Sequence, residues 1–349
     1  MPRTACFLLF AAPWLFSACS KPDYLSDCIP DSSLRREQQE LTRLLRSPDT
    51  GREALFTVKN RIARNLAATD NLPALTAFLT SDAVRGADPY AAYWLLMAAD
   101  VYMEQNSPQI AAYYFERILD NCKDLTVRGN SIHQICLQNL IRITDSPFHL
   151  VRYYTDYIRQ FPQDEKIPEF YFLLGRAHEK AGEWEKAIQS YTRFLQLGQY
   201  DILVPDIPNA YAYAKRITDY NNSAKDWTFA TLDELVTSVK RAIDRYDARA
   251  LERYRAKVNF FSMSWKQDYT DTEDTQVEFQ MRDFMHGNRI TYADELDPTS
   301  TPYEAYLRTS GWNQYVTVWY LYFRKVNFPA DPNIHGRWEW AGIYYGEKI

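Results

Sequence analysis

The chain of 349 residues carries a formal net charge of -5 at pH 7, and hydrophobic residues make up 46% of it. This length suits two domains, and an acidic balance without a block of Lys and Arg argues against nucleic-acid binding. The sequence has 11 glycines and five histidines, and it contains no metalloprotease, nucleophile-elbow, phosphate-loop or dinucleotide motif. We therefore expect a non-enzymatic protein that has no catalytic residues, no cofactor and no bound metal.

The first residues are typical of an export signal. Met1–Arg3 supplies positive charge, Cys6–Phe16 is an apolar run of the length of a signal-peptide core, and small residues then precede Cys19. The run is shorter than the roughly 20 apolar residues of a membrane-spanning helix. Ordinary secretory cleavage after Ala18 is one interpretation of this pattern.

Residues 15–19, with the sequence LFSAC, resemble the lipobox of bacterial lipoproteins, although Phe16 stands where that family usually has an aliphatic residue. The resemblance implies a signal peptide over residues 1–18, acylation of Cys19 and a tether over residues 19–32. It further implies a cell-envelope protein that is lipid-anchored on the periplasmic face of the inner or the outer membrane. More than one acyl chain is expected, because a single chain binds a membrane only weakly and reversibly.

From residue 33 to residue 228, apolar residues recur at the three- and four-residue steps of amphipathic helices. Three segments in this region, which begin at Pro108, Pro147 and Trp184, align with one another. Each has a small or apolar residue three positions later and an apolar or aromatic residue seven and ten positions later. These offsets fall on one helix face, so each segment predicts the second helix of a helical pair.

The segment around Trp184 resembles the tetratricopeptide repeat. Leu174, Gly175, Ala187 and Tyr191 stand at motif positions of that family. The three segments are 39 and 37 residues apart (108 to 147 and 147 to 184), whereas the family repeats every ~34 residues. An irregular helical bundle is the alternative to a repeat.

The resemblance implies a solenoid over residues 33–228 whose first helices form a concave groove for a peptide or an envelope protein. The groove positions of the family correspond here to aromatic, apolar, charged and amide side chains. They are Tyr93, Asp100, Met103, Asn139, Arg142, Phe172, Arg176 and Glu179.

Three cysteines, Cys28, Cys122 and Cys136, remain after the signal peptide and Cys19 are set aside. Cys122 and Cys136 are 14 residues apart, at the end of one predicted helix and inside the next. An oxidising compartment permits a disulfide between them, and two buried free thiols are the alternative.

Two arrangements have weak metal-binding character. His133 and Cys136 are three residues apart on a predicted helix, but a metal site needs more ligands than these two. The stretch Asp268–Glu278 offers carboxylates for Ca²⁺, yet it lacks the glycine-punctuated loop of an EF-hand. A helical histidine beside a core or bridged cysteine and a solvated loop explain the two arrangements better.

A different pattern begins near residue 229. Thr231–Glu234 forms a helix capping box, and the hydrophobic period later changes to two. Strands are expected around Val277–Met281, Tyr315–Phe323 and Trp338–Tyr345. A helix followed by four to six antiparallel strands is an α+β pattern, and it is similar to the cystatin-like or nuclear-transport-factor-like cone.

The chain is thus expected to be an α+β protein of two domains, a tetratricopeptide-like solenoid over residues 33–228 and an α+β domain over residues 229–349. We expect it to act as a membrane-anchored adaptor for protein–protein interactions in the cell envelope. The alternative is a lipoprotein whose C-terminal domain binds a ligand or a glycan, because exposed tryptophans stack on sugar rings. Core packing is the other explanation for the tryptophans concerned, which are Trp265, Trp312, Trp319, Trp338 and Trp340.

Overall fold

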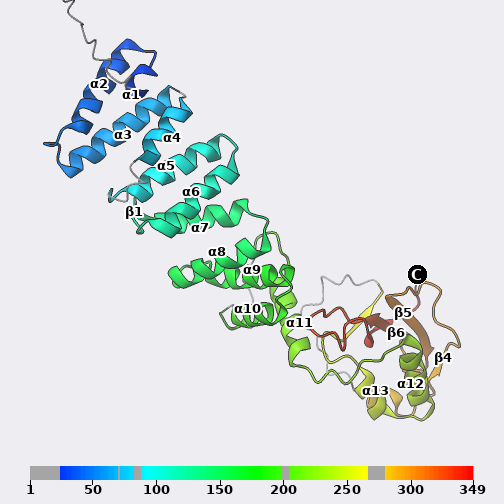
Figure 1. The fold of residues 1–349 in the computed structure, drawn as a ribbon. Coiled ribbons are helices and arrows are strands. Elements are labelled where there is room, and N and C mark those ends of the chain that lie inside the picture. The colour runs from blue at the N-terminus through cyan, green and yellow to red at the C-terminus, as the bar shows by residue number, and fades with distance from the viewer. Residues whose placement is uncertain (1–23, 70, 82–87, 198–203, 266–279, 349) are drawn as a thin grey trace, which may run out of the picture. The chain divides into compact units, whose positions relative to one another are not determined.

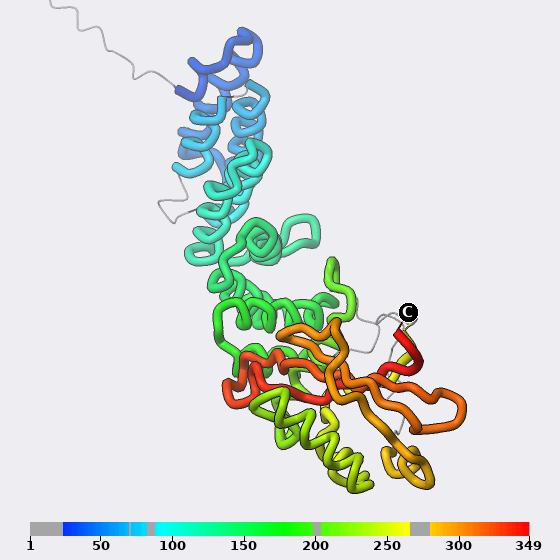
Figure 2. The backbone as a smooth tube through the Cα atoms, turned by 90° about the vertical axis from the view of Figure 1, so that its right-hand side faces the viewer, coloured from blue at the N-terminus to red at the C-terminus, as the bar shows by residue number. Residues whose placement is uncertain are grey.

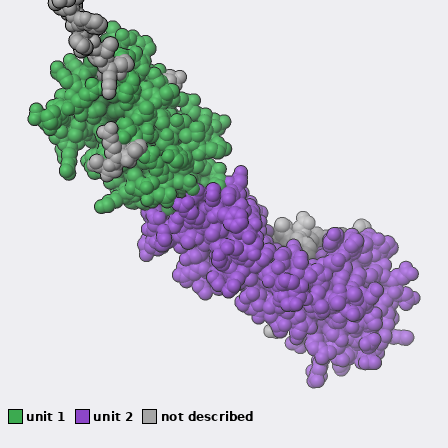
Figure 3. All heavy atoms as spheres, in the orientation of Figure 1, with its two compact units in different colours: residues 1–144 green, residues 145–349 purple. Residues whose placement is uncertain are grey.

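The computed structural model describes residues 24–69, 71–81, 88–197, 204–265 and 280–348. Two compact units make up the chain: unit 1 is Met1–Thr144 and unit 2 is Asp145–Ile349, which Figure 3 shows in green and purple. Within the described ranges, no helix combines the length and the apolar character that crossing a membrane requires.

Unit 1 is a succession of helices in which sequence neighbours pack against each other (Figure 1). Its elements are α1 (Tyr24–Asp27), α2 (Ser32–Arg46), α3 (Arg52–Ala68), α4 (Leu72–Ser81), α5 (Ala91–Glu104), α6 (Pro108–Asn121), β1 (Thr126–Val127), β2 (Asn130–Ser131) and α7 (Ile132–Ile143). Helices α5 and α7 also contact each other, as the first helices of successive repeats do.

A short hairpin, β1–β2, lies between α6 and α7. Arg128 and Gly129 form its turn with φ of 51° and 84°, the left-handed backbone of a type I′ turn. Ser131 then caps α7 by accepting a hydrogen bond from the backbone N of Gln134 at 3.0 Å. The hairpin occupies part of the long connection that separates the first two repeat segments.

Unit 2 begins with helices of the repeat region and continues into a five-stranded sheet with further helices (Figure 1). Its elements are α8 (Pro147–Gln160), α9 (Ile167–Lys180), α10 (Trp184–Leu197), α11 (Ala210–Asn222), α12 (Leu232–Asp244), α13 (Ala248–Tyr254), β3 (Phe261–Ser264), α14 (Met281–Met285), β4 (Thr291–Tyr292), β5 (Glu304–Ser310), β6 (Val318–Lys325) and β7 (Trp338–Tyr345). The three predicted second helices are confirmed, because α6, α8 and α10 begin at Pro108, Pro147 and Trp184.

The pair α9–α10 shows why the repeat motif places a glycine in its first helix. A Cβ atom at Gly175 would lie 2.5 Å from Cε1 of Tyr191, far closer than packed carbon atoms approach. Ala187 of α10 is also fully buried. Small residues on both helices therefore leave room for the large aromatic ring between them.

The five strands of unit 2 have the order β3-β7-β6-β5-β4. Strand β3 runs parallel to β7, and the other neighbouring pairs are antiparallel. The prediction of a fully antiparallel sheet is therefore wrong at this edge, because β3 and β7 are far apart in sequence and no tight turn fixes their direction. Helices combined with a mixed sheet agree with the predicted α+β class, whereas the likeness to a cystatin-like or nuclear-transport-factor-like cone stays a prediction.

The predicted strands agree with the structure to different degrees. The strand at Trp338–Tyr345 is confirmed as β7, and the one expected at Tyr315–Phe323 is found at Val318–Lys325. Met281 begins helix α14 instead of ending a strand, and Val277 lies outside the described residues.

One face of the sheet packs against α12, which runs beside it in Figure 2. Leu235 and Val239 of α12 and Leu321 and Phe323 of β6 are fully buried in this core. The predicted capping box at Thr231 is confirmed and fixes where α12 begins. Burial of each such side chain contributes about 1.5–3 kcal/mol, so this core holds the helix on the sheet.

A second core joins the repeat helices to the sheet domain inside unit 2. It contains Phe172 of α9, Phe194 of α10 and Ile217 of α11 together with Trp227 and Phe328. These side chains lie on both sides of the predicted domain boundary between residues 228 and 229, which stays a prediction.

Glu339 of β7 is a fully buried carboxylate in the same region. Its Oε1 accepts hydrogen bonds from Tyr220 Oη at 2.8 Å and Arg324 Nε at 2.9 Å, and its Oε2 accepts one from Trp227 Nε1 at 2.8 Å. A charge is tolerated in a protein interior only when it is paired and hydrogen-bonded. Because Tyr220 and Trp227 precede the sheet domain in sequence, Glu339 links the two parts of unit 2.

Candidate functional site

A cluster of charged and aromatic side chains lies on α9 and α11, two helices that both pack against α10. Tyr213 Oη of α11 donates to both carboxylate oxygens of Glu179 of α9, at 2.8 and 3.0 Å. Arg176 Nη1 donates to the same carboxylate at 3.1 Å. Glu179 is therefore held by two donors, and its side chain is only 7% exposed.

Two guanidinium groups lie close to the ring of Tyr213. The Cζ atoms of Arg176 and Arg216 lie 5.0 and 5.2 Å from its centroid, within the range of cation–π attraction. The Arg176 side chain remains 39% exposed. This cluster, Arg176–Glu179–Tyr213–Arg216, presents two arginines and a single carboxylate, so it suits a partner group with negative charge. We call it the repeat-face cluster.

Tyr191 lies beside this cluster and is fully buried. Its hydroxyl makes no hydrogen bond among the residues that the structure describes. Burial, and then the nearby Glu179 carboxylate, raise the pKa of Tyr191, and burial followed by the hydrogen bond to Glu179 raises that of Tyr213. Both tyrosines are thus neutral at physiological pH, and Tyr213 acts as a hydrogen-bond donor.

The predicted groove residues of unit 2 separate into two kinds. Arg176 and Glu179 lie in the repeat-face cluster. The placement of Phe172 in the groove needs correction, because this residue is fully buried. Its ring packs on Phe194 and Tyr191 at centroid distances of 5.3 and 5.5 Å. Phe172 is therefore a core residue and cannot reach a partner.

The predicted groove residues of unit 1 lie on α5 and α7. Asp100 is exposed and Met103 half-buried on α5, while Arg142 is exposed on α7 and donates to Asn139 Oδ1 at 2.6 Å. Tyr93, the fifth of them, is half-buried and packs against Phe56 and Trp94 of an aromatic cluster. That these residues bind a partner stays a prediction.

The structure describes Cys122 and Cys136 as free thiols, which is the alternative to the disulfide. Burial raises the pKa of both, and nearby carboxylates, including that of Asp100, add to the effect at Cys136.

His133 Nε2 lies 3.1 Å from the carbonyl oxygen of Cys122. Over the described part of the chain, no three His, Cys, Asp or Glu side chains come together as metal ligands. Cys19 and the stretch Asp268–Glu278 lie outside the described residues, so their predicted roles stay predictions.

The tryptophans of the sheet domain are mostly core residues. Trp312, Trp319, Trp338 and Trp340 are buried, which rules out sugar stacking by these four rings in this structure. Trp265 is half-buried and stacks on Tyr344 with a centroid distance of 4.2 Å, and Lys348 Nζ lies 4.8 Å from its ring. Of the five tryptophans, Trp265 is therefore the one with a partly exposed ring.

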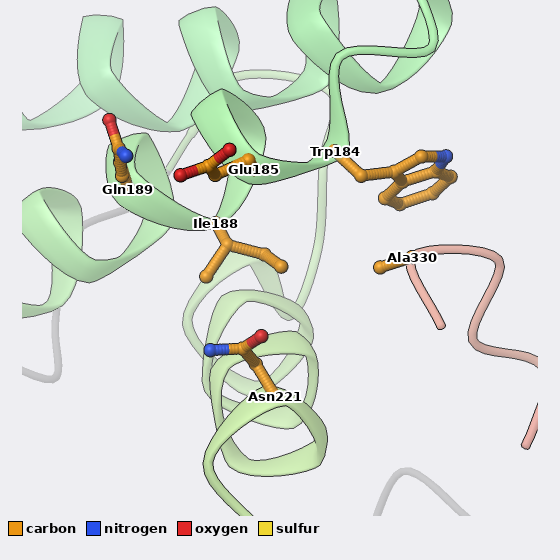
Figure 4. Close-up of a pocket in the computed structure, with 6 residues that line it drawn as sticks. All are labelled: Trp184, Glu185, Ile188, Gln189, Asn221 and Ala330. Atoms are coloured by element: carbon orange, nitrogen blue, oxygen red, sulfur yellow. The ribbon is translucent and has the colours of Figure 1, made fainter. Parts of the chain in front are cut away.

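A shallow pocket of about 330 Å³ lies between α10, the end of α11 and the loop at Ala330. Figure 4 shows the Trp184 indole facing Ala330, and Asn221 of α11 opposite Ile188 of α10. The pocket involves the second helix of the repeat pair, so it is separate from the repeat-face cluster on α9 and α11. Its lining is completed by Glu185 and Gln189.

Sequence reasoning missed two members of the repeat-face cluster, Tyr213 and Arg216. Both lie on α11, after the last segment that carries clear motif residues. Their spacing of three places them on neighbouring positions of one helix face, which is the signal that the sequence offered. That Tyr213 and Arg216 lie beside Arg176 and Glu179 of α9 could be seen only in the structure.

A comparison with known protein families matches part of the repeat region. A family model described as Tetratricopeptide repeat matches residues 168–200, the region of the pair α9–α10. Repeats of this family generally mediate protein–protein binding and are typically non-catalytic, so the match indicates an interaction role for this region. A comparison with curated protein sequences gives no match.

Proposed function

We propose that the chain is a non-catalytic adaptor of the bacterial cell envelope, anchored to a membrane by lipid on Cys19, which binds a peptide or loop of an envelope protein on α9 and α11. The observation that carries the binding role is the repeat-face cluster. The lipobox-like sequence LFSAC at residues 15–19 supports the anchor.

The chemistry of the cluster suits an acidic segment of the partner. A guanidinium group binds a carboxylate through two parallel hydrogen bonds, and Arg176 and Arg216 both lie close to one tyrosine ring. Glu179 and Tyr213 restrain Arg176 before binding, which lowers the entropy lost when the partner docks. The partner is thus expected to present Asp or Glu beside an apolar group that packs on Tyr213.

Charge reversal at the cluster tests the binding role. The double variant Arg176→Glu/Arg216→Glu should lose the proteins that copurify with the wild type from detergent-solubilised membranes, with at least a tenfold reduction in recovery. Arg193→Glu is the matched control, because Arg193 is exposed on α10, the outer helix of the same pair. Recovery of the same partners by the double variant would refute the assignment.

The anchor is tested separately. Cys19→Ser should leave the chain without acyl chains and shift it from the membrane to the soluble fraction, because the protein loses the apolar chains that partition into lipid. Mass spectrometry and fractionation measure the two effects. Unchanged lipid mass and membrane retention would contradict the anchor and leave the repeat-face result unaffected.

The second candidate function is binding of a glycan or other ligand by the sheet domain. The half-buried ring of Trp265, with Tyr344 stacked on it and Lys348 above it, is the observation that favours it. Oligosaccharides that bind there should change the tryptophan fluorescence of the wild type and not that of Trp265→Leu. A response that is equal in both proteins would exclude this face.

A further inference from the structure

We infer that one face of α2 binds an anionic phospholipid surface. This arginine face consists of Arg35, Arg36, Arg43 and Arg46. The inference deepens the proposed function, on which it rests for the position of the membrane.

The arginines gather on one side of the helix. Because consecutive residues of an α-helix are about 100° apart around its axis, the four arginines fall within an arc of about 100°. Ser32 and Gln39, which are neutral, occupy the rest of this arc. The two acidic residues of α2, Glu37 and Glu40, fall outside it. The arc is therefore purely cationic in a chain whose net charge is -5.

The arginine face points away from the core of unit 1. Arg36, Arg43 and Arg46 are exposed, whereas Thr42 and Gln38, which follow the arc beyond Arg35, are buried. Gln38 Oε1 accepts a hydrogen bond at 3.0 Å from Asn65 Nδ2 of α3, which fixes the rotation of α2. The charged groups are thus presented outward by a fixed helix.

Glu37, which is next to Arg36 in sequence, does not neutralise this face. Glu37 is already paired with Arg61 of α3 at 2.5 Å, and this partner lowers the pKa of its carboxyl. Arg35 Nε donates to the carbonyl oxygen of Ile29 at 2.8 Å, which ties one end of the face to the loop between α1 and α2. Arg36 and Arg43 form no ion pair with any described residue. Arg36 and Arg43 therefore retain charge that a counter-surface can meet.

The proposed anchor brings this face close to lipid. Tyr24, the first residue of α1, is five positions after Cys19, and five residues span at most about 18 Å. Helix α1 packs on α2. Attraction between basic side chains and anionic lipid falls off within a Debye length of roughly 8–10 Å, so the face must lie against the lipid for this attraction to act.

Vesicle binding by the full chain carrying Cys19→Ser tests the inference without an acyl anchor. It should cosediment with vesicles of phosphatidylcholine mixed with phosphatidylglycerol much more than with phosphatidylcholine alone. Arg36→Gln/Arg43→Gln/Arg46→Gln should reduce binding to the mixed vesicles by about tenfold or more. The control is Arg159→Gln/Lys186→Gln/Arg193→Gln, which removes three exposed charges from unit 2 and should change binding by less than about twofold.

Three outcomes would overturn the inference. The first is equal binding to both vesicle types. The second is equal binding by the arginine variant and its parent protein when circular dichroism shows both folded. The third is displacement of the vesicles by a short DNA duplex at a lower concentration than by phosphatidylglycerol micelles. Since this assay contains neither the acyl anchor nor a protein partner, its failure is distinct from failure of the proposed function. Conversely, binding here would stand even if Cys19 proved unacylated.

Discussion

The repeat face and the sheet domain of unit 2 use aromatic residues in opposite ways. On the repeat face, Tyr213 is half-buried, lies close to Arg176 and Arg216, and donates to Glu179. In the sheet, Trp319 is fully buried and stacks on Trp312 at 4.9 Å. Residue type alone therefore does not mark a binding surface. The neighbours of a ring, cations at one place and other rings at the other, decide its role.

The largest expected effect contrasts two aromatic residues of one hairpin. Trp319→Ala should lower the free energy of unfolding by about 3–5 kcal/mol, because it removes a buried ring and leaves a cavity. Tyr315, in the same hairpin, is 96% exposed, and Tyr315→Ala should change stability by no more than about 0.5 kcal/mol. Urea unfolding followed by circular dichroism measures both. Similar losses for the two variants would contradict the division between core and surface rings.

The next effect concerns the buried carboxylate between the repeat helices and the sheet. Glu339→Gln should cost about 2–4 kcal/mol, because an amide replaces the charge that Tyr220, Trp227 and Arg324 hydrogen-bond. Glu347→Gln, on an exposed ion pair with Arg308, should cost far less. A larger loss from Glu347→Gln would show that the buried site is not the stabilising one.

A smaller loss is expected inside the repeat pair. Gly175→Ala should destabilise unit 2 by about 1–3 kcal/mol, because the new methyl group overlaps the Tyr191 ring. Gly51→Ala is a suitable control, since no atom lies within 4 Å of the position its Cβ would take. Combining Gly175→Ala with Tyr191→Leu should cost less than the sum of the single variants. Strict additivity would mean that the overlap is relieved elsewhere.

The last effect is absent at neutral pH and appears only in alkali. Burial, and then Glu169, raise the pKa of Tyr154 to about 12. Below pH 10 the hydroxyl is neutral in both states, whereas between about pH 10 and 12 the unfolded chain releases its proton first, so the free energy of unfolding falls. Urea unfolding across this range should show a steeper fall for the wild type than for Tyr154→Phe. Parallel curves would place Tyr154 in contact with water.

Much of the helical region could be predicted from sequence, because a helix face is visible as a spacing. The starts of α6, α8 and α10 coincide with Pro108, Pro147 and Trp184 for this reason. The groove was less predictable, since spacing does not show whether a helix face meets solvent or another helix. Phe172 was assigned to the surface on its motif position, and only the packing of α10 and α11 reveals it as core.

The sheet was harder to predict, because strand pairing depends on partners that are distant in sequence. Strand β5 escaped prediction, since its inward row includes Thr309, a polar residue whose hydroxyl accepts from Trp312 Nε1 at 2.7 Å. The parallel pairing of β3 with β7 leaves no trace in the period of either strand. The helix cap at Thr231 was predictable, because a capping box depends only on residues close together in sequence.

The shared core around Trp227 has a consequence for dissecting the molecule. Cleavage of the chain at residue 228 would separate Phe172 and Trp227 from Phe328. Each fragment would then expose an apolar surface that promotes aggregation. Proteolysis in the adjoining loop should therefore give pieces that stay together or precipitate. The final repeat helices and the sheet thus form one folding unit. A protein that had only one of these two parts would need other residues to cover the exposed core.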